Sequence, residues 1–152
     1  MKLRNFIGID PGMSGAMAVI SLDDDGRSVV KVIPFDRNDY VYATTLFWGD
    51  DTRCVLERVH SMPKQGVSSS FSFGENFGWI QGVLYANRIP YELVLPQKWK
   101  REFGVTADKN TAIEVARRLF PEVSLRRTDR CRKDDDGMAE ALLMAEYCRR
   151  HS

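Results

Sequence analysis

Five acidic residues stand where the chain passes between apolar segments: Asp10, Glu57, Asp135, Asp136 and Glu140. Asp10 follows a short apolar run, and Asp136 and Glu140, four residues apart, share one face of a predicted helix. Carboxylates that converge repel one another and are costly to bury unless cations neutralise them. Two Mg²⁺ ions held by such a cluster could support phosphodiester hydrolysis, one activating the attacking water and the other stabilising the leaving 3′ oxygen.

Each carboxylate also has a purely structural interpretation. An aspartate before Pro-Gly is common in turns, and an aspartate near the start of a helix is commonly a cap. Glu57 is harder to explain in this way, because it interrupts the apolar run Cys54–Val59. The functional interpretation therefore depends on whether the fold brings these residues together.

The hydrophobic pattern predicts the elements that must position them. Strands are expected at 6–9, 16–20, 29–33, 54–59 and 91–95. Helices are expected at 36–48, 72–87 and 108–120, and from within 134–137 to about 149, with a loop at 61–70. This order predicts one α/β domain over residues 1–152, with a five-stranded mixed sheet, its first three strands antiparallel, flanked by helices. The strand at 54–59 can then pair beside a central first strand, so that Asp10 and Glu57 project towards the last helix.

Composition limits the class of protein. The apolar fraction is 43% and the charged fraction 28%, as in a soluble globular protein. No apolar run approaches the roughly 20 residues needed to cross a bilayer, and no signal peptide is evident, so we expect a cytoplasmic protein with no membrane partner. The net charge of +1 hides a basic segment, Pro96–Lys133, with eleven Lys or Arg against five Asp or Glu. A basic surface beside an acidic cluster suits a protein that binds phosphates and metal ions, although it is also compatible with an ordinary solvated surface.

Four sequence blocks, in order, resemble the RuvC-type Holliday-junction resolvases of the RNase H-like superfamily, and most closely their compact bacteriophage versions. The blocks are Ile7–Gly12, Leu56–Glu57, Pro96–Lys100 and Asp135–Leu143. The resemblance implies an RNase H-like fold and a homodimer that binds a four-way DNA junction. It also implies that each subunit nicks one of two opposed strands with Mg²⁺, for which Mn²⁺ substitutes.

The resemblance also assigns the catalytic residues: Asp10, Glu57, Asp136, Glu140 and Lys100. Asp10 and Glu57 match metal ligands of the family, and Glu140 falls where the family usually has an aspartate. The last two acidic residues are four apart here and usually three apart in the cellular enzymes. Either Asp136 or Asp135 is therefore the third ligand, and we favour Asp136.

The residues expected to contact DNA are His60, Lys64, Lys98, Lys100, Arg126, Arg127 and Arg130. By resemblance, Lys100 matches a lysine near the scissile phosphate, where an ammonium could offset developing charge. His60 falls where the cellular enzymes carry an aromatic ring that stacks at the junction centre. Each has a structural alternative. Lys100 is then an ordinary solvated lysine, His60 a plain loop histidine, and the arginines part of a mobile basic loop.

Gly74, Gly78 and Gly82 lie on one face of the predicted helix at 72–87. A glycine inside a helix costs about 1 kcal/mol relative to alanine, so three on one face suggest close approach of another backbone. The resemblance places this helix at a dimer interface. Close packing on the chain's own sheet is the alternative.

Two other functions compete with a resolvase. The run Asp10–Gly15 after a strand is also typical of the phosphate loop of actin-like kinases and ATPases. Those proteins need two such domains and a second phosphate loop, for which 152 residues leave no room. A non-catalytic module that binds branched DNA is the second competitor, and the acidic residues at the expected positions count against it.

Overall fold

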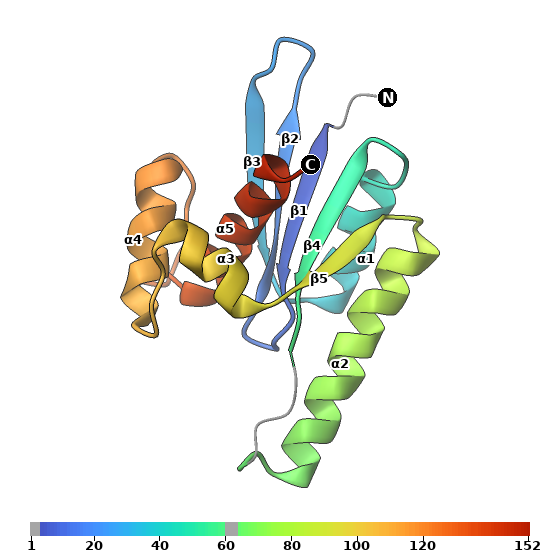
Figure 1. Ribbon diagram of the computed structural model, residues 1–152, viewed down its shortest axis with the longest axis vertical. Coiled ribbons are helices and arrows are strands. Elements are labelled where there is room, and N and C mark those ends of the chain that lie inside the picture. The colour runs from blue at the N-terminus through green and yellow to red at the C-terminus, as the bar shows by residue number, and fades with distance from the viewer. Residues whose placement is uncertain (1–3, 60–63) are drawn as a thin grey trace.

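The computed structural model describes residues 4–59 and 64–152, which form a sheet with helices on both of its faces (Figure 1). The strands are β1 Asn5–Asp10, β2 Ala16–Leu22, β3 Ser28–Pro34, β4 Thr52–Glu57 and β5 Tyr91–Val94. The helices are α1 Arg37–Leu46, α2 Val67–Ala86, α3 Pro96–Phe103, α4 Lys109–Leu119 and α5 Asp136–Arg150.

The strand order in the sheet is β3-β2-β1-β4-β5. Strands β1, β2 and β3 pair antiparallel, whereas β4 is parallel to β1 and β5 is parallel to β4. The predicted mixed α/β sheet, with three antiparallel strands first and β1 at its centre, is confirmed. The ends of β1 and β4 consequently meet at the same edge of the sheet.

Strand side chains alternate between two apolar layers, as the period of two in a strand requires. On one face, Phe6 and Val55 pack in a cluster with α3, α4 and α5. On the other face, Ile7, Ile9 and Leu56 pack in a cluster with residues of α1 and α2. Both faces of β1 and β4 are thus buried, so these strands have nearly continuous apolar sequences.

Helix α5 packs directly on β1 at Gly8. A Cβ atom added there would lie 2.2 Å from the backbone nitrogen of Ala145 and 2.4 Å from the carbonyl oxygen of Ala141. Alanines on α5 and on the facing strand β2, among them Ala16 and Ala18, keep the helix close to the sheet. This close approach carries the first turns of α5 to the edge of the sheet where β1 ends.

Helix α2 is longer than the sequence pattern predicts, and the predicted loop at 61–70 is wrong for residues 67–70. The first buried residue of α2 is Asn76, so its first two turns contact little of the core and have no inward apolar periodicity to reveal them. The part of that loop at 61–63 lies outside the described residues. Across the described ranges, no helix has the length and apolar character needed to span a membrane.

Helix α3 was not predicted from the pattern, because only Trp99 and Phe103 of its eight residues are buried. The other predicted helices are confirmed with small changes at their ends. Asp36 and Asp108 cap α1 and α4, accepting hydrogen bonds from the backbone N–H groups of Asp39 and Asn110.

Replacement of Gly8 by alanine should destabilise the fold, because the new methyl group would overlap backbone atoms of α5 that cannot move independently. We expect Gly8→Ala to lower the free energy of unfolding by about 3 kcal/mol, the upper end for overpacking a core. Urea denaturation followed by circular dichroism measures this change. Gly66→Ala is the control, since a Cβ there meets no atom within 4 Å, and a loss as large as that of Gly8→Ala would contradict the proposed contact.

Candidate active site

Two of the predicted acidic residues end neighbouring parallel strands. Asp10 is the last residue of β1 and Glu57 is the last residue of β4. Ile9 pairs with Leu56 in the register of these strands, so the two carboxylates follow side by side. Because Ile9 and Leu56 face α1 and α2, the alternation of a strand turns Asp10 and Glu57 to the opposite face, towards α5.

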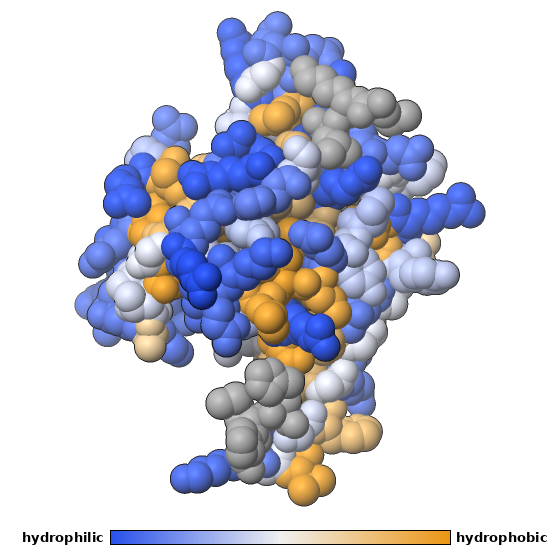
Figure 2. Space-filling view, in the orientation of Figure 1, coloured by the Kyte–Doolittle hydropathy of each residue, from blue (hydrophilic) through white to orange (hydrophobic). Residues whose placement is uncertain are grey.

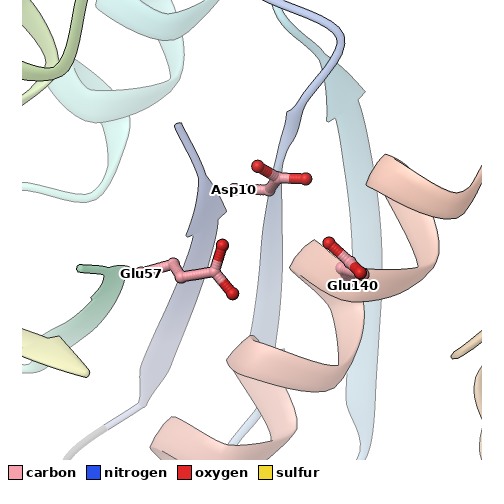
Figure 3. Close-up of side chains that lie close together, drawn as sticks. All are labelled: Asp10, Glu57 and Glu140. Atoms are coloured by element: carbon pink, nitrogen blue, oxygen red, sulfur yellow. The ribbon is translucent and has the colours of Figure 1, made fainter. Parts of the chain in front are cut away.

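Glu140 completes a compact group on that face. It lies one turn into α5, and one carboxylate oxygen from each of Asp10, Glu57 and Glu140 lies within 4.8 Å of the other two. Figure 3 shows the three side chains pointing towards one another from two strands and a helix. Sequence reasoning included all three residues, and the structure brings them together.

Burial changes the protonation of this cluster. It raises the pKa of Glu57 to about 7, an effect opposed by the hydrogen bond from Trp99. Burial, together with the charges of Asp10 and Glu57, raises the pKa of Glu140 to about 8. Burial also raises the pKa of Asp10, although a hydrogen bond from the Gly12 backbone opposes it. One buried and two partly buried carboxyl groups that resist ionisation together form a site whose charged state needs compensating cations.

Helix α3 supplies two groups that favour the charged state. The indole Nε1 of Trp99 donates a hydrogen bond to Oε2 of Glu57 over 2.8 Å, and Trp99 is fully buried. The ammonium of Lys100 lies 3.8 Å from Oε1 of Glu140. Lys100 was expected near the site from the sequence, but Trp99 was not identified. A buried tryptophan on an amphipathic helix is an ordinary core residue until the tertiary structure shows what its N–H contacts.

The turn that follows Asp10 is held from three sides. Asn76 of α2 donates a hydrogen bond to the carbonyl oxygen of Pro11 over 2.9 Å. Arg127 donates hydrogen bonds to the carbonyl oxygens of Ser14 and Gly15. Gly137, near the start of α5, lies so close that a Cβ there would be 2.4 Å from the Ser14 oxygen. The turn after Asp10 is thus fixed to α2 and to the segment before α5, and the Gly137 contact brings it against the end of α5 that carries Glu140.

The two other acidic candidates occupy different places. Asp135 caps α5 by accepting a hydrogen bond from the backbone N–H of Met138, and it also pairs with Arg127 over 2.9 Å. Asp136 lies 3.7 Å from the ammonium of Lys109. Neither is in the group of three, but Asp136 is close enough for its charge to raise the pKa of both Asp10 and Glu140. Lys109 was not among the candidates from the sequence, since nothing in the sequence relates the start of α4 to the start of α5.

The basic candidates are distributed over the surface. Lys64, Lys98, Arg126 and Arg130 are exposed, whereas Arg127 is partly buried and already engaged by Asp135, Ser14 and Gly15. Arg126 lies 4.0 Å from Asp134. His60 lies outside the described residues.

The donor set of Asp10, Glu57 and Glu140 fits a hard divalent cation. Carboxylate oxygens are the ligands that Mg²⁺ and Mn²⁺ prefer in proteins. The unfavourable burial of three carboxylates supports the same assignment, because a bound cation would remove the repulsion among them.

Solved structures share this architecture. The Thermus thermophilus RuvC structure aligns with a TM-score of 0.61 at 16% identity, covering 97% of this chain and 96% of that one. This chain has the RuvC fold. T. thermophilus RuvC in complex with a Holliday junction substrate aligns with a TM-score of 0.60 at 11% identity, covering 93% and 90% of the two chains. The yeast mitochondrial Holliday junction resolvase aligns with a TM-score of 0.51 at 13% identity, covering 96% and 83%.

No protein-family profile matches the sequence, and no curated protein matches it either. The likeness to the RuvC structures therefore lies in the fold. It agrees with the RNase H-like architecture that the sequence blocks predict.

The raised pKa values predict that stability without metal depends on pH. Because Glu57 and Glu140 bind protons more tightly when folded, their contribution to stability is full below about pH 4.5 and is lost as the pH rises through about 7 to 8. In EDTA, Glu140→Gln should therefore unfold at a higher temperature than the parent at about pH 9. This difference in unfolding temperature should shrink towards pH 5. Each tenfold difference in proton affinity between the folded and unfolded states corresponds to about 1.4 kcal/mol of unfolding free energy.

Thermal unfolding followed by circular dichroism at a series of pH values measures this dependence. Glu114→Gln, at an exposed position of α4, is the matched control and should follow the parent. A constant difference between Glu140→Gln and the parent across this range would contradict the buried cluster.

Proposed function

We propose that this chain is a metal-dependent endonuclease that resolves four-way (Holliday) or other branched DNA junctions. The observation that carries the proposal is the convergence of Asp10, Glu57 and Glu140 beside Lys100, in a chain with the RuvC fold. One of the aligned structures is a RuvC in complex with a Holliday junction substrate, which supports branched DNA as the partner. The proposed nuclease domain spans residues 1–152 and acts in the cytoplasm of a bacterial or phage-infected cell.

Mg²⁺ is the proposed cofactor, with Mn²⁺ as a substitute and two ions in each site. Asp10, Glu57 and Glu140 would hold the ions. Asp136 is the proposed additional ligand, because its charge raises the pKa of both Asp10 and Glu140. Asp135 is a weaker candidate than Asp136, since the helix cap and Arg127 already use both of its oxygens. When bound, such ions supply an activated water and stabilise the leaving 3′ oxygen of a phosphodiester.

The protein's own cations complete the site. The ammonium of Lys100 is only partly exposed and faces Glu140, so it can offset negative charge on a phosphate that approaches the carboxylates. Lys109, beside Asp136, is mostly exposed and can contribute in the same way from the solvent side. We assign Lys100 to the scissile phosphate and Lys109 to a neighbouring one.

The basic segment is the proposed DNA-binding surface, with phosphate contacts from exposed lysines and arginines: Lys64, Lys98, Arg126 and Arg130. His60 is proposed to stack at the junction centre. Arg127 was expected to contact DNA directly, but its hydrogen bonds to the turn after Asp10 favour a positioning role. Contacts of this kind neutralise phosphates and release counterions, so binding should weaken with salt.

A homodimer is proposed through α2. Gly74, Gly78 and Gly82 face open space, since a Cβ added at any of them meets no atom within 4 Å. Intrachain packing, the alternative for these glycines, is therefore not supported. At steps of three and four residues along the same face lie three large exposed side chains: Val67, Phe71 and Tyr85. Figure 2 shows hydrophobic surface at the end of the molecule where α2 begins. A second copy of α2 could approach closely at the glycines and cover these side chains.

Loss of the Asp10 carboxylate should abolish cleavage but not DNA binding. We expect Asp10→Asn to nick a synthetic four-way junction at least about 100-fold more slowly, because losing a ligand should exceed the loss caused by outer groups around a metal. Mobility shifts in Ca²⁺ should show junction binding that is unchanged or tighter, since one repulsive charge is removed.

The same assay separates the competing functions. Nicking by the parent in Mg²⁺ that requires a junction, and not a plain duplex, supports a resolvase. Binding without nicking would identify a non-catalytic module, and nucleotide hydrolysis without either would identify a phosphate-loop enzyme. Nicking at parental rates by Asp10→Asn would exclude this site.

Enlarging the centre of the glycine stripe should separate the subunits. Gly78→Leu places a bulky side chain between the two helices, so we expect sedimentation velocity to show a shift towards monomer. Ser72→Leu, at an exposed position of α2 outside the stripe, is the matched control and should leave the association unchanged. A cruciform-plasmid assay should then show single nicks in place of paired incision. A Gly78→Leu protein that associates like the parent would move the interface elsewhere.

A further inference from the structure

The environment of Trp99 differs from that of an ordinary core tryptophan. Its side chain is completely buried, in the same apolar cluster as Phe103 and Leu142. Its polar N–H points to a carboxylate of the acidic cluster, over 2.8 Å to Oε2 of Glu57. Buried indole N–H groups usually find a partner, but here the partner is the buried carboxyl group of Glu57, a member of the proposed metal site.

The geometry of α3 directs this contact. Leu95 leads from β5 into a helix that begins with Pro96, so the first turn of α3 starts next to the end of β4, where Glu57 lies. Trp99 and Phe103, one turn apart, face inward and anchor the helix. Lys100, next in sequence, reaches Glu140, with its ammonium 5.7 Å from the centre of the Trp99 ring. One helical turn thus contacts two of the three clustered carboxylates.

We propose that Trp99 is a positioning residue of the metal site, which orients the Glu57 carboxylate for a divalent cation by donating its indole N–H. The inference rests on the proposed metal-dependent function. A carboxylate oxygen that accepts a hydrogen bond from a rigid, buried ring cannot rotate freely, so the second oxygen is held ready for a cation. Outer groups of this kind typically change metal affinity or activity by about 10–100-fold when mutated.

The first test removes the donor and keeps an aromatic ring. Trp99→Phe should weaken Mn²⁺ binding, measured by isothermal titration calorimetry without DNA, by about 10-fold or more. Phe103→Leu is the matched control, because it replaces a buried ring in the same helix and cluster with a smaller side chain and removes no hydrogen bond to a carboxylate. It should lower thermal stability but leave Mn²⁺ affinity within about twofold of the parent.

The second test needs no change at Trp99. The chain has three tryptophans, so Trp48→Phe with Trp79→Phe leaves Trp99 as the only indole. Mn²⁺ is paramagnetic and should quench the Trp99 fluorescence with the same saturation curve that calorimetry records. Adding Asp10→Asn to this protein should remove the quenching at those concentrations.

The outcomes distinguish the two proposals. Parental Mn²⁺ affinity in Trp99→Phe, or an equal loss in Trp99→Phe and Phe103→Leu, would overturn the positioning role while leaving the metal site intact. If Trp99→Phe does not fold, the single-tryptophan protein carries the test. Unchanged fluorescence while calorimetry shows Mn²⁺ bound overturns the role, because the ion then lies away from Glu57, and saturable quenching supports it by placing the ion beside Trp99. A parent protein that binds no Mn²⁺ would overturn the metal-dependent function and the positioning role together.

Discussion

Helix α5 and strand β1 meet backbone to backbone at Gly8, where even a methyl group would lie little more than 2 Å from atoms of the helix. This approach sets the depth of α5 in the molecule, and hence the position of Glu140. With a larger residue at Gly8, the helix would stand further from the sheet, and the carboxylate of Glu140 could not reach those of Asp10 and Glu57. The glycine at position 8 thus determines how closely Glu140 approaches the two strand carboxylates.

Bringing these three carboxylates together destabilises the folded protein when no cation is bound. Burial raises the pKa of all three clustered carboxylates, and repulsion from the other members of the cluster adds to this effect at Glu57 and Glu140, so the ionised forms oppose folding. Trp99 and Lys100 offset part of this cost from α3. Active sites commonly retain such locally unfavourable arrangements, which the rest of the fold must compensate. Here the compensation comes from two apolar layers that cover both faces of β1 and β4.

Hydrogen bonds to the turn after Asp10 connect the site to segments that are distant in the sequence. Arg127, from the basic segment before α5, bonds to both the turn after β1 and the cap residue Asp135. Asn76 reaches the same turn from α2, the helix whose opposite face carries the exposed glycines. The proposed DNA-binding segment and the proposed dimer helix therefore each donate a hydrogen bond to the turn that follows Asp10. A change in any one of them has a short physical route to Asp10.

The sequence alone determined the sheet and most of the helices, because apolar periodicity and helix caps are local signals. It also predicted five acidic candidates for one site, and the structure brings three of them together: Asp10, Glu57 and Glu140. The start of α2 and the whole of α3 could not be found in this way, because few of their residues contact the core. Only the tertiary structure showed that Asp135 caps α5 and pairs with Arg127, and that Arg127 bonds to the turn after Asp10. It also placed the N–H of Trp99 on Glu57, a contact between residues 42 positions apart. Such pairings depend on how helices dock on the sheet, which no local pattern records.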